Sequence, residues 1–375
     1  MPSDGSTGSR LGVFHDTGAP QDSTDFTTLV ILHGHNWHGG TFSRLIPLAA
    51  SSGYNTRLVL LNRRDYPGST PYTDEERAMV AKLTPDDSED AAMLAKAGVR
   101  FGRFLRDRAR EVFDFLEDLV RHDHIPPAQH SKNTGGIVVA GWSLGALWMT
   151  SLLAYAPTFP VNDVELSAYV RRVVVFDTGN IVMGYPRRSD MYVRAFDPRL
   201  PPEERAASYD VWDRALAISS YYPHGGTLDT IAVRPLDDPP PTLSTLSGAE
   251  RASMTFQADG DLDSRIMITG IQSGLFMSIR HRALLLPNNE GGESREDGVM
   301  DAWKDVEARF VWGGRSLPEV AHAMLTLRSE VENAKERGQP LRKVKLVTVK
   351  DGNHFVHWDH PEHAMRALLG EDEVV

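Results

Sequence analysis

One serine of the chain lies between two glycines, in a pattern typical of a nucleophile. The segment Gly141-Trp142-Ser143-Leu144-Gly145 has the form G-x-S-x-G, with an alanine on either side. This spacing suits a sharp turn from a strand into a helix, because larger side chains two residues from the serine would collide there. The turn exposes the serine oxygen at the N-terminus of the helix. The pattern predicts that Ser143 is a nucleophile for acyl transfer.

Three histidines near the C-terminus could supply the base that a serine nucleophile needs. His354 lies in Asp351-Gly352-Asn353-His354-Phe355, directly after an apolar run of strand length. Histidine titrates in the range needed to accept the serine proton. His357 and His360 follow closely, but Asp359-His360-Pro361-Glu362 has the form of a capping box that begins at its aspartate. We therefore predict that His354 is the general base and that His360 is structural.

An early segment, Ile31-Leu32-His33-Gly34-His35-Asn36-Trp37, could supply hydrogen-bond donors to the same site. Acyl transfer needs two N–H groups aimed at the developing oxyanion. We predict the amide of Leu144 as one donor and that of His35 as the other, with Asn36 as the alternative. His33 is interpreted as a residue that braces the loop. The residues expected to contact substrate are Asn36, Trp37 and Trp142.

Alternating strands and helices must position these residues. Apolar runs of strand length precede the three motifs, and the spacing of apolar residues predicts a long helix over residues 100–121. This alternation predicts an α/β fold, with a mostly parallel central sheet and helices on both faces. Strands are expected at residues 11–14, 27–32, 57–62, 137–140, 172–176, 308–312 and 344–349, and later helices at 317–337 and after Pro361.

The alternation stops between residues 179 and 301, where prolines and aromatic residues become frequent. We interpret this segment as a mainly helical cap or lid, inserted over the active site. Residues 11–178 and 302–375 are then the two parts of the core, and residues 1–10 are a flexible leader. The aromatic residues expected mostly in the core of the cap are Trp212, Tyr221, Tyr222 and Phe276.

The motifs at His33-Gly34, at Ser143 and at Gly352-Asn353-His354-Phe355 resemble those of the α/β-hydrolase superfamily. Within it, the chain is similar to enzymes of the alpha/beta hydrolase-1 type that carry a cap domain. The motifs occur in the order of that fold: oxyanion loop, nucleophile, histidine. The segment Asn62-Arg63-Arg64-Asp65-Tyr66-Pro67-Gly68-Ser69 also fits the family's loop after its fourth strand. The resemblance implies an α/β-hydrolase fold and a serine hydrolase.

The resemblance also bears on the acid of the triad. The family's usual acid follows its seventh strand, often as W-G-x-x-D, but this chain has Trp312-Gly313-Gly314-Arg315-Ser316 there. Glu319 is close by, yet Ser316-Leu317-Pro318-Glu319 has the form of a capping box. Another acid position of the family, after its sixth strand, holds Asp177, although its surroundings also suit a turn. We predict Asp177 as the acid that orients the histidine, with Glu319 as the alternative.

These residues imply cleavage of a carboxylic ester or lactone of a small, largely apolar substrate through an acyl-enzyme. Acyl transfer to an alcohol and cleavage of a carbon–carbon bond use the same triad and are also compatible with the sequence. A ligand receptor that keeps the fold without catalysis is a further alternative. Nucleophilic-aspartate enzymes are excluded, because the nucleophile position holds Ser143.

A metallohydrolase is the alternative from a different class. His33, His35 and His38 form H-x-H-x-x-H, which resembles the metallo-β-lactamase motif. That motif has an aspartate immediately before its third histidine, and here Trp37 stands in that position and cannot ligate a metal. We therefore expect neither a metal nor a cofactor.

The composition limits the classes of partner. The 375 residues carry a formal net charge of −11 and include no cysteine. An acidic surface repels phosphate groups, so neither nucleic acid nor a membrane is expected as a partner, and the apolar runs are too short to span a bilayer. The N-terminus does not resemble a secretory signal, which favours a cytoplasmic protein. The sequence indicates neither the individual substrate nor the oligomeric state.

Overall fold

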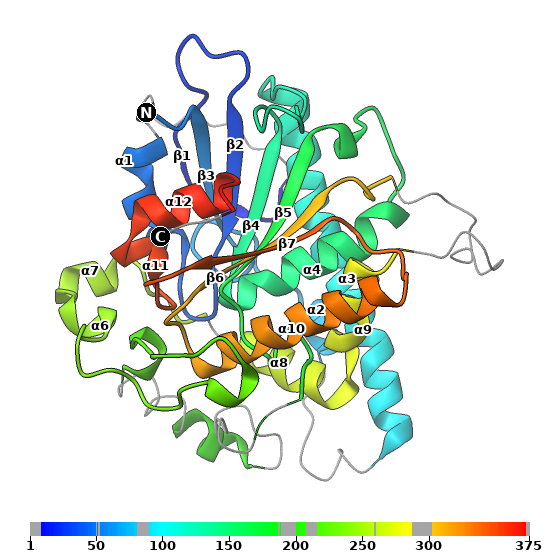
Figure 1. Cartoon of the computed structure of the whole chain (residues 1–375). Coiled ribbons are helices and arrows are strands. Elements are labelled where there is room, and N and C mark those ends of the chain that lie inside the picture. The colour runs from blue at the N-terminus through cyan, green and yellow to red at the C-terminus, as the bar shows by residue number, and fades with distance from the viewer. Residues whose placement is uncertain are drawn as a thin grey trace.

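The computed structural model describes residues 9–49, 51, 53–80, 90–186, 188, 200–207, 216–258, 260–286 and 302–372. Within these ranges, strands form a single sheet with the order β1-β3-β2-β4-β5-β6-β7, in which only β1 is antiparallel to its neighbour (Figure 1). The mostly parallel sheet expected from the sequence is confirmed. The strands are β1 (Gly12–Asp16), β2 (Thr27–Leu32), β3 (Thr56–Asn62), β4 (Ile137–Trp142), β5 (Val170–Phe176), β6 (Glu307–Gly313) and β7 (Val344–Val349).

The interior strands are buried along their whole length because both faces of the sheet are covered. Every residue of β2, β3, β4, β5 and β6 is buried, as parallel strands between two helical layers require. The edge strand β7 has only two buried residues among its six. The continuous apolar runs of the sequence therefore correspond to the interior strands.

Helices cover the sheet on either side (Figure 1). On one side α3 and α4 pack against each other, and α4 contacts β4 and β5. On the other side α12 contacts β4, β7 and the turn that follows β2. The longer helices are α3 (Ala91–His122), α4 (Ala146–Tyr155), α8 (Leu262–Ser273), α9 (Leu275–Leu284), α10 (Pro318–Glu336) and α12 (Pro361–Leu369). The shorter ones are α1 (Ile46–Ala49), α2 (Asp74–Met79), α6 (Thr242–Thr245), α7 (Gly248–Ala252) and α11 (Val356–Asp359), with 3-10 turns at Gly39–Leu45, Ser143–Gly145, Ala156–Thr158, Leu166–Ala168, Ala217–Ser219 and Leu228–Thr230.

The long helix α3 extends further than the sequence predicted. It starts at Ala91 instead of residue 100, because Asp90 accepts hydrogen bonds from the amides of Ala92 and Met93 and so caps the first turn. Its buried residues Phe101, Phe104, Leu105, Val112 and Leu116 recur at helical spacing, as the apolar pattern indicated.

The segment from 179 to 301, called the insert, contains the helices α6, α7, α8 and α9, and its residues 202–207 are also helical. Within the described part, α8 packs on α3 and α9 packs on α4. Tyr221, Tyr222 and Phe276 are each at most 5% exposed. Phe276 packs on Phe101 of α3, and the Tyr221 hydroxyl binds Asp359, so both are buried against the core. Trp212 and the predicted leader up to residue 8 lie outside the described residues.

The capping box expected at Asp359 is wrong. Helix α12 begins after His360, which makes no side-chain capping bond. The Asp359 carboxylate instead accepts a hydrogen bond from the Tyr221 hydroxyl at 2.6 Å and another from the Thr242 hydroxyl. The Asp359 carboxylate therefore binds two hydroxyl groups of the insert, and does not cap the helix as the local pattern indicated.

No helix within the described ranges is both long and apolar enough to cross a membrane.

Candidate active site

The predicted site residues meet at the carboxyl ends of the parallel strands. Ser143 follows β4, Asp177 follows β5 and His354 lies in the loop after β7. The loop that begins with His33 follows β2, the strand next to β4. The carboxyl ends of parallel strands lie at one edge of a sheet, which is where ligands bind in such folds. The sheet therefore brings together residues that are up to about 320 positions apart in the sequence.

Ser143 occupies the sharp turn that its sequence motif predicted. Its φ angle is 55°, a left-handed conformation that is strained for a residue with a side chain. A Cβ at Gly141 would lie 2.2 Å from the Gly145 carbonyl oxygen, and one at Gly145 would lie 2.6 Å from that of His33. Only glycine therefore fits on either side of the serine. The strain is maintained because the strand, the helix and the oxyanion loop all enclose the turn.

A chain of hydrogen bonds links three of the predicted residues. His354 Nε2 lies 3.2 Å from Ser143 Oγ, and His354 Nδ1 lies 2.7 Å from Asp177 Oδ1. A carboxylate can only accept, so Nδ1 carries the hydrogen and Nε2 is left to accept from the serine hydroxyl. The arrangement can therefore remove the serine proton as the oxygen attacks a carbonyl carbon.

The Asp177 carboxylate is completely buried and held by two further donors. The backbone N–H of Gly313 donates to Oδ2 at 2.6 Å, and Ser316 Oγ donates to Oδ1 at 2.5 Å. Hydrogen bonds to an ionised carboxylate compensate for the loss of water around it. The capping role expected for Ser316 is therefore wrong, since α10 has Leu317 at its N-cap and no side-chain capping bond. Glu319, the alternative acid, lines the pocket.

Two residues support the loop that carries His354. Trp142 Nε1 donates to the His354 carbonyl oxygen at 2.9 Å, and its fully buried ring packs against the His354 ring. Asn353 Nδ2 donates to the Ser219 carbonyl oxygen of the insert at 2.7 Å. Trp142 was expected to contact substrate, but it lies beneath the loop and not among the pocket residues, because its large apolar ring is needed in the core.

His357, the nearest alternative base, is also structural. Its Nε2 lies 3.2 Å from the Thr41 hydroxyl, and its ring packs on Phe42, Trp142 and Phe176. Burial lowers the pKa of this histidine well below its usual value. His360 stacks on His363 at the start of α12, away from the serine.

The oxyanion loop runs alongside the serine. A Cβ at Gly34 would lie 2.8 Å from the Cβ of Ser143, so the backbone here approaches the nucleophile as closely as glycine allows. The Asn36 amide donates to the Tyr66 hydroxyl at 3.1 Å and is therefore already engaged. Among the predicted second donors, His35 is the one that lines the pocket; Asn36 does not.

His33 braces the loop, as interpreted from the sequence. Its Nδ1 lies 2.8 Å from the Gly34 carbonyl oxygen, and its Nε2 accepts from the Arg63 amide at 3.1 Å. Burial lowers the pKa of His33 well below its usual value, and the Arg63 charge lowers it further. Both ring nitrogens are thus used by the protein. Among the residues that the structure describes, no three His, Cys, Asp or Glu side chains gather as a metal site would require.

Sequence reasoning did not identify a buried ion pair behind this loop. Arg63 forms a two-pronged contact with Asp263 of the insert, at 2.8 Å and 2.6 Å. The Tyr66 hydroxyl donates to the same carboxylate at 2.7 Å. Arg63 and Tyr66 belonged to a segment that fitted a family loop, but nothing in the local sequence distinguishes Asp263 from a helix-start aspartate.

A pocket of about 100 Å³ opens above Ser143. Its walls are mainly apolar, and the insert contributes to them beside the core. Trp37 lines it, as expected for a residue that contacts substrate. The apolar lining residues include Trp37, Leu144, Ile181, Val182, Ile218, Met267, Leu317 and Val320.

The chain matches a family model and is similar to several solved structures. Residues 29–368 match the model of the "Alpha/beta hydrolase family". Similar solved structures include a thioesterase domain from the curacin biosynthetic pathway (13% identity, TM-score 0.37, covering 95% of this chain and 94% of that one). Others are a bromoperoxidase from Bacillus anthracis (13%, 0.42, 95% and 92%) and a putative ancestral haloalkane dehalogenase (14%, 0.46, 96% and 94%). No curated protein matches the chain.

Proposed function

Since the chain belongs to the alpha/beta hydrolase family, we propose that it is a serine hydrolase that cleaves a carboxylic ester or lactone of a small, largely apolar substrate. The observation that carries the proposal is the hydrogen-bonded series Ser143–His354–Asp177, with its serine at the floor of an apolar pocket. A nucleophile, a base within reach and a group that orients the base are the parts that covalent acyl transfer needs.

The proposed reaction has two acyl-transfer steps. Ser143 Oγ attacks the carbonyl carbon while His354 Nε2 takes the serine proton, and His354 then protonates the departing alcohol oxygen. Water, deprotonated by the same nitrogen, attacks the acyl-enzyme and releases the acid and the free serine. Asp177 stabilises the charged imidazole throughout. The amides of His35 and Leu144 are the proposed donors to the oxyanion in both steps. The proposed reaction uses side chains, backbone amides and water, and it assigns no role to a metal or a cofactor.

The pocket limits the acyl group that the proposal admits. An apolar cavity of about 150 Å³ accepts benzene, so a pocket of about 100 Å³ suits an acyl chain of roughly four carbons. Its walls offer mostly aliphatic contacts, which favour an unbranched or lightly branched apolar chain. We also propose that the insert acts as the cap, because Ile181, Ile218 and Met267 reach the pocket from it.

Hydrolysis of an ester and lactone panel by the wild type and by Ser143→Ala tests the proposal. The wild type should prefer acyl chains near four carbons over chains of twelve. The Ser143→Ala change should lower kcat by about 10⁴- to 10⁶-fold, by the precedent of other serine nucleophiles. A fluorophosphonate should label Ser143 in the wild type and in the control Ser51→Ala, whose serine is exposed and remote. Labelling of the Ser143→Ala protein at another serine would contradict the assignment.

A further inference from the structure

Arg63 is buried between the oxyanion loop and helix α8 of the insert. Its side chain is 1% exposed. Nη2 donates to the Gly34 carbonyl oxygen at 2.9 Å, and Nε donates to the His33 carbonyl oxygen at 3.1 Å. Nη1 and Nη2 donate to the Asp263 carboxylate, and Nη2 also donates to the Tyr66 hydroxyl. One guanidinium thus connects the backbone of the oxyanion loop to a carboxylate that belongs to the insert.

The contact to the Gly34 carbonyl oxygen bears on how the Gly34–His35 peptide is turned. Its carbonyl oxygen also faces His33 Nδ1 at 2.8 Å, so two donors hold it from the side away from the pocket. The peptide is trans, and in a trans peptide the N–H points opposite to the carbonyl. Gly34 lies so close to Ser143 that a Cβ on it would be 2.8 Å from the Ser143 Cβ. The N–H of His35 is therefore directed towards the serine side, where an oxyanion would form.

Asp263 makes this arrangement possible in two ways. An arginine without a counter-ion would be costly at such a buried position, and Asp263 neutralises it. Burial tends to raise the pKa of the Asp263 carboxyl, but the adjacent Arg63 outweighs burial and holds this pKa well below its usual range. The carboxylate also accepts from the Tyr66 hydroxyl, which in turn accepts from the Asn36 amide. The Asp263 carboxylate is thus linked to two peptides of the loop: through Arg63 to the Gly34–His35 peptide, and through Tyr66 to the His35–Asn36 peptide.

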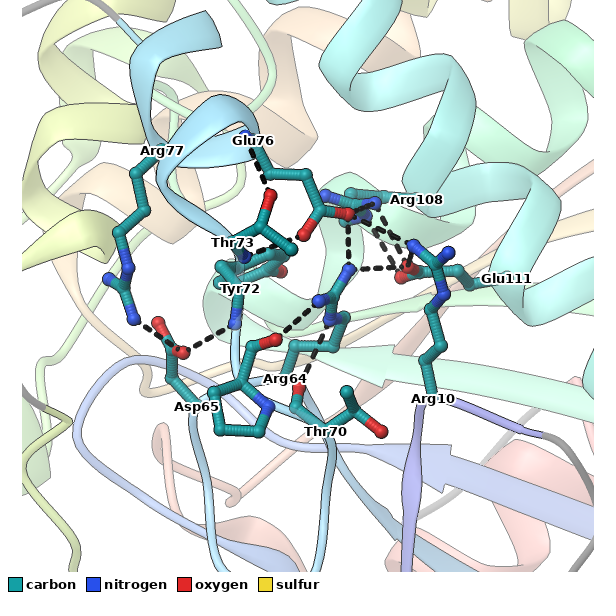
Figure 2. A network of polar contacts seen from close by, with 11 residues as sticks. Arg10, Arg64, Asp65, Thr70, Tyr72, Thr73, Glu76, Arg77, Arg108 and Glu111 are labelled. Atoms are coloured by element: carbon teal, nitrogen blue, oxygen red, sulfur yellow. Dashed lines mark hydrogen bonds and ion pairs between the residues drawn. The ribbon is translucent and has the colours of Figure 1, made fainter.

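The loop that carries Arg63 is anchored firmly on its other side. Figure 2 shows the network: Arg64 contacts Glu76 at 2.5 Å and Glu111 of α3 at 3.0 Å, while Arg77 contacts Asp65 at 2.7 Å. These contacts join the loop to helices α2 and α3 of the core. Several ion pairs therefore hold the core side of the loop. The insert contributes the Asp263 carboxylate of α8, which binds Arg63.

Helix α8 also reaches the substrate pocket. Met267 lines the pocket, and it lies four residues after Asp263, so both project from the same face of the helix. We propose that Asp263 is a positioning residue for the oxyanion hole: through Arg63 it orients the Gly34–His35 peptide, so that seating of the insert on the core completes the catalytic site. The inference rests on the proposed serine-hydrolase function.

The Asp263→Asn variant tests the inference, because it keeps the size of the side chain and removes its charge. Loss of one oxyanion donor costs about 10²- to 10³-fold in kcat, so partial misorientation should lower kcat by about 10- to 100-fold and leave KM within about threefold. The affinity for a boronic acid, whose adduct with Ser143 places an oxygen in the oxyanion position, should fall by a similar factor. A residue that only stabilised the fold would not weaken this adduct selectively.

Glu307→Gln is the matched control. Glu307 is a buried carboxylate that pairs with Arg172 at 3.1 Å and Arg309 at 2.8 Å, at the start of β6 and therefore at the sheet edge opposite to the site. Both variants should lower Tm, but Glu307→Gln should keep the kcat and the boronic acid affinity of the wild type. A folded Asp263→Asn protein with wild-type kcat and boronic acid affinity would overturn the inference.

If Asp263→Asn does not fold, Tyr66→Phe replaces it, since this change removes only the hydroxyl that donates to Asp263 and accepts from Arg63 Nη2 and the Asn36 amide. It should lower kcat and the boronic acid affinity together, with KM unchanged, and wild-type values of both would overturn the inference. The proposed function is judged separately, by turnover and fluorophosphonate labelling of the wild type. A wild type that is labelled and active, beside a fully active Asp263→Asn, would reject the positioning role alone.

Discussion

The hydroxyl of Ser316 donates a hydrogen bond to the same oxygen of Asp177 that accepts from His354, at 2.5 Å and 2.7 Å respectively. Ser316 stands where related sequences often have their acid, after the strand β6. In this chain the carboxylate belongs to Asp177, directly after the neighbouring strand β5. Ser316, after β6, donates a hydrogen bond to it. Both positions therefore contribute to one interaction with His354. Asp177 supplies the negative charge, and Ser316 orients the Asp177 carboxylate.

Replacement of Asp177 by asparagine should lower kcat by about 10⁴-fold, by the precedent of the aspartate in serine proteases. The amide group would keep the size of the side chain but could present an N–H to His354 and favour the wrong tautomer. Glu319→Gln should change kcat by less than about tenfold, because Glu319 lines the pocket while Asp177 and Ser143 engage the two ring nitrogens of His354. Steady-state kinetics of both variants decide between the two acids. A larger loss in Glu319→Gln would identify Glu319 as the acid.

Moving the acid from β5 to β6 should partly rescue the asparagine variant. Ser316 Oγ and His354 Nδ1 share one oxygen of Asp177, so a carboxylate at position 316 should come within reach of the histidine. The double variant Asp177→Asn/Ser316→Asp should have a kcat at least about tenfold higher than that of Asp177→Asn. This gain recovers only a small part of the kcat lost in Asp177→Asn. Asp177→Asn/Ser316→Asn, which adds the same bulk without the charge, should show no gain. Equal activity of the two double variants would refute the relocation.

A methyl group on the oxyanion loop should damage catalysis more than folding. The Cβ of Gly34→Ala would lie 2.8 Å from Ser143 Cβ and 3.3 Å from Ser143 Oγ, which forces the loop or the nucleophile to move. A displacement of about 1 Å at a reacting group can cost about 10²-fold in rate, so we expect a loss of kcat of at least that order with a folded protein. Gly226→Ala, where a Cβ meets no atom within 4 Å, is the control and should retain wild-type kcat and circular dichroism. Full activity of Gly34→Ala would show that the loop can retreat from the serine.

The network around Glu76 should make the fold sensitive to acid. Burial tends to raise the pKa of Glu76, but the hydrogen bond from Arg64 and the charge of Arg108 outweigh it and lower this pKa to about 2. A pKa that is lower in the folded than in the unfolded chain adds stability above the unfolded value, near 4.3, and this stability is lost as the pH falls towards the folded value. Glu76→Gln should therefore be less stable than the wild type at pH 7, and the difference should shrink between about pH 4.5 and 2.5. Urea unfolding across this range measures it, and a constant difference would contradict the assignment.

The local sequence alone predicted the sharp turn at Ser143 and the strands around it. A glycine two residues on either side of Ser143 is required by the turn itself, which involves only a few adjacent residues. The strands at 27–32 and 344–349 agree with β2 and β7 at both ends. Their β-branched and aliphatic residues favour strands both inside the sheet, where β2 is wholly buried, and at its edge, where β7 has only two buried residues. The identity of His354 as the histidine nearest the strand end likewise followed from its place in the chain.

The tertiary structure alone decided which polar groups pair across the fold. Ser316 and Asp359 have the local form of helix caps, yet each makes its hydrogen bonds with residues more than a hundred positions away: Asp177, Tyr221 and Thr242. A cap at a helix end can be replaced by water, whereas a buried carboxylate such as that of Asp177 must find its donors within the protein. The pairing of Asp263 with Arg63 arises in the same way, since both charges are removed from water only when the insert packs on the core. Such partners are set by burial, which no short stretch of sequence encodes.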